Sequence, residues 1–134
     1  MSTPRLPDWQ ARLGALLDAR RTMPFAWGSN DCCLFAADCV QAVTGIDPAL
    51  GLRQYNDAAG AARMLARLGG VRGAGNALLG VSVGALFARV GDIGEVQVGQ
   101  REALGVCNGD GWLAVGEVGL VALPLSNAVR AWRF

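Results

Sequence analysis

The chain has 134 residues, of which 52% are hydrophobic and 17% charged, and its formal net charge is +1. This length fits a single domain spanning residues 1–134, and the apolar content is high enough for a real core, which argues against disorder. Every basic residue is an arginine. Near-neutral charge predicts no nucleic-acid partner, whereas arginine–carboxylate contacts with other proteins are compatible with it.

The N-terminal residues show no secretion or membrane signal. Residues 1–12 mix prolines, an aspartate and two arginines and contain no apolar central stretch, so we expect no signal peptide. No apolar run approaches the roughly 20 residues needed to cross a bilayer. We therefore expect a protein that is synthesised in the cytoplasm and has no membrane span.

The first half of the sequence predicts three helices. The first follows Pro7-Asp8 and ends before Pro24, because the residue before a proline avoids the helical region. Its apolar residues recur at helical spacing: Trp9, Leu13, Leu16 and Leu17.

A second helix is expected from Asn30-Asp31 to Gly45, and a third from Asp57 to Leu68 with Gly69-Gly70 as its stop. The second helix carries an apolar stripe along one face: Cys32, Phe35, Ala36, Cys39, Val40 and Val43.

The second half predicts strands. A glycine-rich stretch, residues 71–84, shows no clear element, and β-prone segments follow it: residues 93–98, 103–107, 112–115, 120–123 and 129–133. Asn108-Gly109-Asp110-Gly111 is a strong hairpin signal. Short turns favour antiparallel pairing, since parallel strands need long crossovers. The prediction is an α+β fold, with N-terminal helices packed on a C-terminal antiparallel β-sheet.

The four cysteines, Cys32, Cys33, Cys39 and Cys107, include no C-x-x-C pair, and the chain contains no histidine. Without a secretion signal, disulfides are not expected. The spacing matches no common ligand pattern, so neither a metal nor a cofactor is predicted, although metal binding by Cys33, Cys39 or Cys107 stays open.

Cys32 holds the most informative position. It follows an aromatic–glycine turn, residues 24–31, and begins an apolar helix, with Asp31 as the expected cap. The partial positive charge at a helix N-terminus favours a thiolate over a thiol. A nucleophile and a simple core cysteine both fit these residues. Cys39, two turns along the helix, is most simply a small buried hydrophobe.

This segment resembles the signature of the NlpC/P60 superfamily, in which an aromatic-Trp-Gly turn precedes Asp-Cys-Ser-Gly and a helix. Gly91-Asp92-Ile93, residues 103–109 and residues 112–115 resemble the family's strands, in the same order. The resemblance implies a papain-like fold, a nucleophilic Cys32 and a cleft containing Trp27, Asp31 and Cys33.

A closer resemblance is to a family of short proteins encoded among phage and prophage tail-tip genes. It rests on Pro-Phe-x-Trp-Gly-x-x-Asp-Cys, Phe-Ala-Ala-Asp, Thr-Gly-x-Asp-Pro and a terminal Ala-Trp-Arg. It implies tail or baseplate proteins as partners and a location in the virion.

The sequence differs from the peptidase pattern at the positions that carry out catalysis. Cys33-Leu34 replaces Ser-Gly, and Ala103 and Ala114 occupy the two positions that match the histidine slots. A thiol needs a paired base for activation and for protonation of the leaving amine. Glu102 is next to the first slot but should face the other side of its strand, while Glu117 and Asp92 are expected in turns.

The sequence therefore leaves competing functions. One is a structural or assembly component of a tail tip or baseplate that is catalytically inactive. The alternative is a peptidoglycan cysteine endopeptidase that uses Cys32 with a non-histidine or partner-supplied base. A thiol protein of the cytosol is a third.

Two further groups have ordinary interpretations. Trp9, Trp27, Trp112 and Trp132 are expected in the core or a groove wall. Arg63 and Arg67, which are four residues apart on one helix face, are expected in solvent, although such a pair could also dock a partner.

Overall fold

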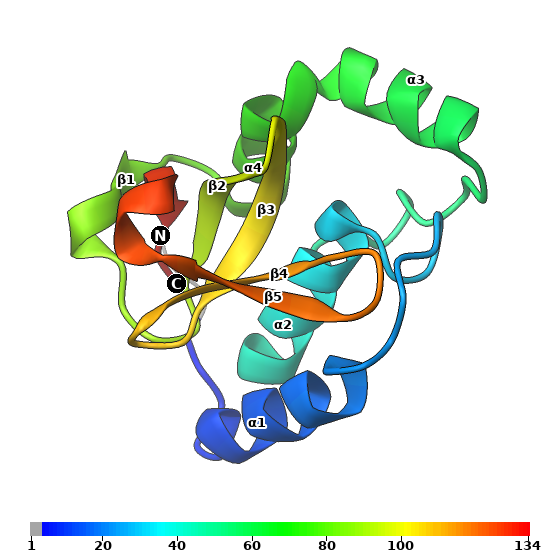
Figure 1. Ribbon diagram of the computed structural model, residues 1–134. Coiled ribbons are helices and arrows are strands. Elements are labelled where there is room, and N and C mark those ends of the chain that lie inside the picture. The colour runs from blue at the N-terminus through cyan, green and yellow to red at the C-terminus, as the bar shows by residue number, and fades with distance from the viewer. Residues whose placement is uncertain (1–3) are drawn as a thin grey trace.

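Four helices precede a six-stranded sheet in a computed structural model that describes residues 4–134 (Figure 1). The helices are α1 (Trp9–Arg20), α2 (Cys32–Thr44), α3 (Ala58–Leu68) and α4 (Gly70–Leu79). The strands are β1 (Val83–Gly84), β2 (Ile93–Val98), β3 (Arg101–Cys107), β4 (Gly111–Val115), β5 (Leu120–Pro124) and β6 (Ala128–Trp132). Two single turns of 3₁₀ helix span Ala85–Phe87 and Leu125–Asn127.

The three predicted helices are confirmed, and their ends lie where the capping residues placed them. The Asp31 side chain accepts the N–H of Leu34 at the start of α2, and Asp57 does the same for Gly60 at the start of α3. Gly45 and Gly69 end these helices in the left-handed conformation, which glycine adopts at little steric cost. No helix among residues 4–134 has the length and apolar character needed to cross a membrane.

Helix α4 was not predicted from the glycine-rich sequence of residues 71–84. Its glycines lower helix propensity, but tertiary packing overrides that preference. Val71 and Ala74 are buried, and a Cβ added to Gly75 would lie 2.3 Å from the indole of Trp132. Gly75 is therefore required for close approach of α4 to the sheet. The two-residue strand β1, which pairs with β6, was missed as well.

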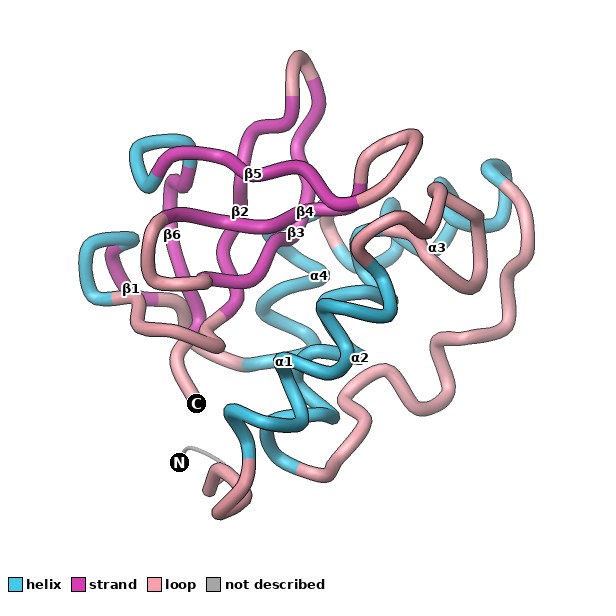
Figure 2. Tube along the Cα trace, turned by 60° about the horizontal axis from the view of Figure 1, so that its bottom comes forward, coloured by secondary structure: helices cyan, strands magenta, loops and turns pink. Residues whose placement is uncertain are grey.

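All the strands pair antiparallel, in the order β1-β6-β2-β3-β4-β5. The five predicted strands are present, with ends within two residues of their expected positions. The last strand does not join β5 but returns to pair with β2. The helices gather on one side and the strands on the other (Figure 2). The predicted α+β class is confirmed.

The sheet has a buried cluster on each face. On the helix side, Phe35 of α2 belongs to the same cluster as Leu104, Val106 and Trp132. On the other side, β4 and β5 cross β2 and β3 steeply (Figure 1), and the fully buried Trp112 lies against Gly94 of β2. The sheet thus curls over its own second core.

The contact between Gly94 and Trp112 yields a first prediction. An alanine Cβ at residue 94 would lie 2.5 Å from the Trp112 ring, so we expect Gly94→Ala to lower the free energy of unfolding by about 1–3 kcal/mol. Gly14, exposed in α1 with no atom within 4 Å of an added Cβ, is the control. There Gly14→Ala should raise that free energy by about 0.5–1 kcal/mol. Denaturant unfolding of both variants measures the difference, and equal stability of the two would contradict the curled-sheet packing.

Candidate functional site around Cys32

The turn before α2 is held by one glycine. Ala26 and Asn30 form a bridge across it, and Gly28 has a φ of 80°. A Cβ on Gly28 would lie 2.3 Å from the carbonyl oxygen of Tyr55. Phe25 and Trp27 meet edge to face, with ring centroids 4.6 Å apart. The glycine thus allows the loop before α3 to lie directly against the turn that leads to Cys32.

Asp31 is buried and fully hydrogen-bonded. Its Oδ1 accepts the N–H of Leu34 at 3.0 Å, and its Oδ2 accepts the N–H of Gly28 at 3.0 Å and the hydroxyl of Tyr55 at 2.6 Å. Burial, followed by this bond to Asp31, raises the pKa of Tyr55 well above its ordinary value. The carboxylate therefore has a structural role: it fixes the start of α2 and joins it to two other segments.

A polar network fixes α2 from its outer side. The buried Asn30 donates to the carbonyls of Met23 and Pro24 and accepts from Arg20. Arg20 also pairs with Asp38 of α2. Arg53 joins Asp38 to Asp47, with nitrogen–oxygen distances of 2.6 and 2.8 Å.

Cys32 is the first residue of α2, and its side chain is half-buried. Its Sγ lies 4.0 Å from the Sγ of Cys33. The hydrogen bond from Cys33 lowers the pKa of Cys32, burial opposes this effect, and the backbone N–H of Leu104 lowers the pKa further. The negative charge of Asp31 raises it, and the positive charge of Arg101 lowers it. The net result is a pKa below the ordinary value, so the site favours a thiolate on Cys32.

Cys33 carries the opposite shift. Its bond to Cys32 and its burial raise its pKa far above the ordinary value. The pKa values of the two neighbouring thiols are therefore shifted in opposite directions, although either sulfur can donate in the contact between them. Cys39, fully buried as expected, also has a raised pKa because of burial.

Ala103 and Ala114, which occupy the predicted histidine slots, are completely buried in the cluster inside the curled sheet. Cys32 packs against that cluster as well as against the helix-side one, so the structure places the thiol where the two cores meet. Leu104, the residue after Ala103, supplies the N–H to the sulfur. Methyl side chains at the two alanines can neither take nor give a proton.

None of the three carboxylates considered from the sequence forms a hydrogen bond with Cys32 among residues 4–134. Asp92 is fully buried and paired with Arg5 at 2.8 Å. Glu102 and Glu117 are exposed, and strand alternation separates Glu102 from the buried Ala103, as predicted.

The sequence reasoning missed two groups near the thiol. Arg101 lies two residues before Ala103 on β3, donates to the carbonyl of Val115 at 2.9 Å and lies over the ring of Phe25. Tyr55 reaches Asp31 from the loop before α3. No local motif marked either residue, because both approach the site through tertiary contacts.

The tryptophans divide between the core and the surface. Trp112 and Trp132 are fully buried, Trp9 packs against the helix-side cluster, and Trp27 is 42% exposed beside the site. All four cysteines are free. Among residues 4–134, no three His, Cys, Asp or Glu side chains are grouped so that they could hold a metal ion.

The thiol pair yields a second prediction. Removing the Cys33 donor destabilises the Cys32 thiolate, so Cys33→Ala should raise the pKa of Cys32 and slow its alkylation at pH 7 by about threefold. Cys33→Ser, which keeps a donor, should retain the lowered pKa. The measurement is the rate of iodoacetamide labelling against pH, with mass spectrometry locating the label. Identical pH profiles for the wild type and the alanine variant would refute this role of Cys33.

The comparisons with known proteins add one match. No curated protein and no solved structure matches this chain. The model of one family, a domain of unknown function designated DUF6950, matches residues 4–134. That match covers nearly the whole chain, and the protein therefore belongs to the DUF6950 family.

Proposed function

We propose that this protein is a structural or assembly component of a phage tail tip or baseplate, built on a degenerate papain-like fold of the NlpC/P60 type and lacking peptidase activity. The resemblance of the Asp31-Cys32 segment and of the following strands to NlpC/P60 proteins supports the fold assignment. The tail-tip resemblance supports the context, with other tail proteins as partners and the virion as the location.

One observation carries the proposal: the partners of the Cys32 sulfur. That sulfur lies 4.0 Å from the Sγ of Cys33, and the backbone N–H of Leu104 helps to lower its pKa. A backbone N–H has no site that accepts a proton, and the strongly raised pKa of Cys33 keeps its thiol protonated, so neither group is a general base for Cys32. The chain has no histidine, and the matching positions hold Ala103 and Ala114.

The missing step is proton transfer to the leaving group. A thiolate could attack a peptide carbonyl, but the departing amine must receive a proton, which the imidazole provides in cysteine peptidases. Arg101 cannot supply it, because a guanidinium does not deprotonate in proteins. Cys33 is a poor source, because its pKa is strongly raised. The lowered pKa of Cys32 thus supports attack by a thiolate, but neither Arg101 nor Cys33 can protonate the leaving amine.

The alternative function has its own supporting observation. The lowered pKa of Cys32 suits a nucleophile, and a neighbouring subunit in an assembled particle could supply a base. On that hypothesis the protein is a peptidoglycan endopeptidase that becomes active only within the tail.

A third prediction separates these functions. Purified protein incubated with peptidoglycan fragments should release no new amine, and Cys32→Ala should be indistinguishable from the wild type. Loss of a catalytic base typically lowers the rate by on the order of 10⁴, so the assay needs a histidine-containing peptidase as its positive reference.

The same variant should then be tested in particles. Tails assembled with Cys32→Ala in place of the wild type should be normal in number and infectivity, whereas deletion of the gene should abolish assembly. Amine release that depends on Cys32, by purified protein or by intact tails, would overturn the proposal in favour of the endopeptidase.

A further inference from the structure

Two arginines differ from the other ten because their side chains have no partner within residues 4–134. Of the twelve, ten form an ion pair or a hydrogen bond within residues 4–134. The two exceptions in this part of the chain are Arg63 and Arg67, both exposed on α3. An unpaired guanidinium is a strong donor to planar anions, since its five N–H groups match a carboxylate in two places at once.

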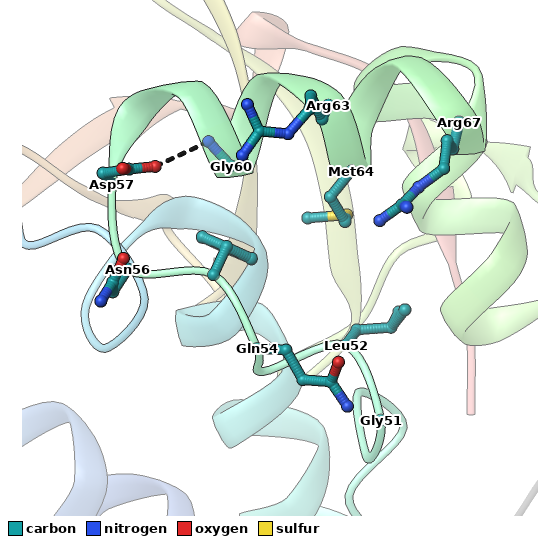
Figure 3. A pocket seen from close by; sticks show the side chains of 10 residues that line it. Gly51, Leu52, Gln54, Asn56, Asp57, Gly60, Arg63, Met64 and Arg67 are labelled. Atoms are coloured by element: carbon teal, nitrogen blue, oxygen red, sulfur yellow. Dashed lines mark hydrogen bonds between the residues drawn. The ribbon is translucent and has the colours of Figure 1, made fainter.

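These two arginines border the same hollow, which has a volume of about 310 Å³ (Figure 3). Arg63 and Arg67 project from α3 above it, and Gln54 lies on the facing loop with Leu52. The amides of Gln54 and Asn56 add neutral hydrogen-bonding groups around the opening.

The hollow has a net positive charge. Asp57 also lines it, with one carboxylate oxygen accepting the N–H of Gly60 at 2.7 Å. Two guanidinium groups and one carboxylate leave a local charge of +1. Asp57 can accept an amide N–H from a bound peptide, which inorganic phosphate cannot offer.

Apolar side chains lie beside these polar groups. The hollow includes Leu52 and the buried Met64. Leu50, next to the lining residue Gly51, is 84% exposed. A ligand that places a carboxylate on the arginines can therefore set an aliphatic side chain against Leu52.

We propose that this hollow is a docking site for an acidic peptide segment of another protein, in which Glu or Asp carboxylates bind Arg63 and Arg67 and an adjacent aliphatic residue covers Leu52. The proposal rests on the proposed assembly function and names the chemistry of the partner. The thiol of Cys32 has no part in it.

The experiment is a titration of ¹⁵N-labelled full-length protein, followed by amide chemical shifts. The probe is the capped peptide Leu-Glu-Glu-Leu, compared with Leu-Gln-Gln-Leu, inorganic phosphate and peptidoglycan stem peptides. We expect the Glu peptide to perturb residues 50–67, with a dissociation constant of about 1 mM, and the Gln peptide to leave them unchanged. Raising the salt from about 0.02 M to about 0.5 M should weaken the binding.

Variants test the arginines individually. Arg63→Gln and Arg67→Gln should each weaken binding by about fivefold, and the double variant should abolish it. Arg12→Gln, which removes an exposed arginine of α1, is the matched control and should bind like the wild type. Circular dichroism verifies that each variant is folded.

The other outcomes overturn the proposal. Absence of shifts in residues 50–67, or equal binding of the Glu and Gln peptides, would exclude carboxylate recognition. Tighter binding of phosphate would identify a phosphate site instead, and tighter binding of stem peptides would identify the cell wall as the ligand. The two proposals fail separately. If the peptide does not bind, tails that carry Cys32→Ala can still assemble normally. If hydrolysis depends on Cys32, the assembly function is refuted even though the peptide still binds.

Discussion

The buried carboxylate of Asp31 joins the segments on which the candidate site depends. It accepts N–H groups from the turn at Gly28 and from the first turn of α2, and it accepts the hydroxyl of Tyr55 from the loop before α3. A buried carboxylate without donors would be costly, so the three bonds form together or the local structure is lost. Because Cys32 follows Asp31 directly, these hydrogen bonds also fix the position of Cys32 at the start of α2. The same three hydrogen bonds thus cap α2, hold the loop before α3 and position Cys32.

The polar network of Asp38 gives a physical role to two stretches of the tail-tip resemblance. Asp38 and Asp47, which belong to the Phe-Ala-Ala-Asp and Thr-Gly-x-Asp-Pro stretches, are both bound by Arg53, and Asp38 also binds Arg20. These residues join α1, α2 and the loop after α2 without contacting the thiol. These two stretches of the tail-tip resemblance therefore stabilise the fold.

Local rules predicted the elements whose ends carry local signals. Asp31, Gly45 and Asp57 fixed helix boundaries because capping is decided within one turn of chain. Helix α4 escaped prediction because the need for Gly75 is explained only by Trp132, which lies more than fifty residues away along the chain. The position of β6 beside β2 likewise depends on packing across the sheet.

The same distinction applies to the site. Cys32 and its helix were predictable from adjacent residues, and the vacant base positions followed from the family resemblance, which remains a prediction. Arg101, Tyr55 and the N–H of Leu104 act on the thiol or on its neighbour from other elements. No spacing rule connects them to Cys32. Similarly, helix periodicity places Arg63 and Arg67 on one face of α3, but only the tertiary structure shows that neither forms an ion pair or a side-chain hydrogen bond within residues 4–134.

The distribution of the four thiols has a practical consequence for following the unfolding of this protein. Cys32 is half-buried at the meeting point of the two cores, whereas Cys39 lies within the helix-side cluster and Cys107 within the curled sheet. A thiol in a closed core reacts only while that core is open. The protein therefore carries an intrinsic reporter for each layer: labelling of Cys39 registers separation of the helices from the sheet, and labelling of Cys107 registers uncurling of the sheet itself.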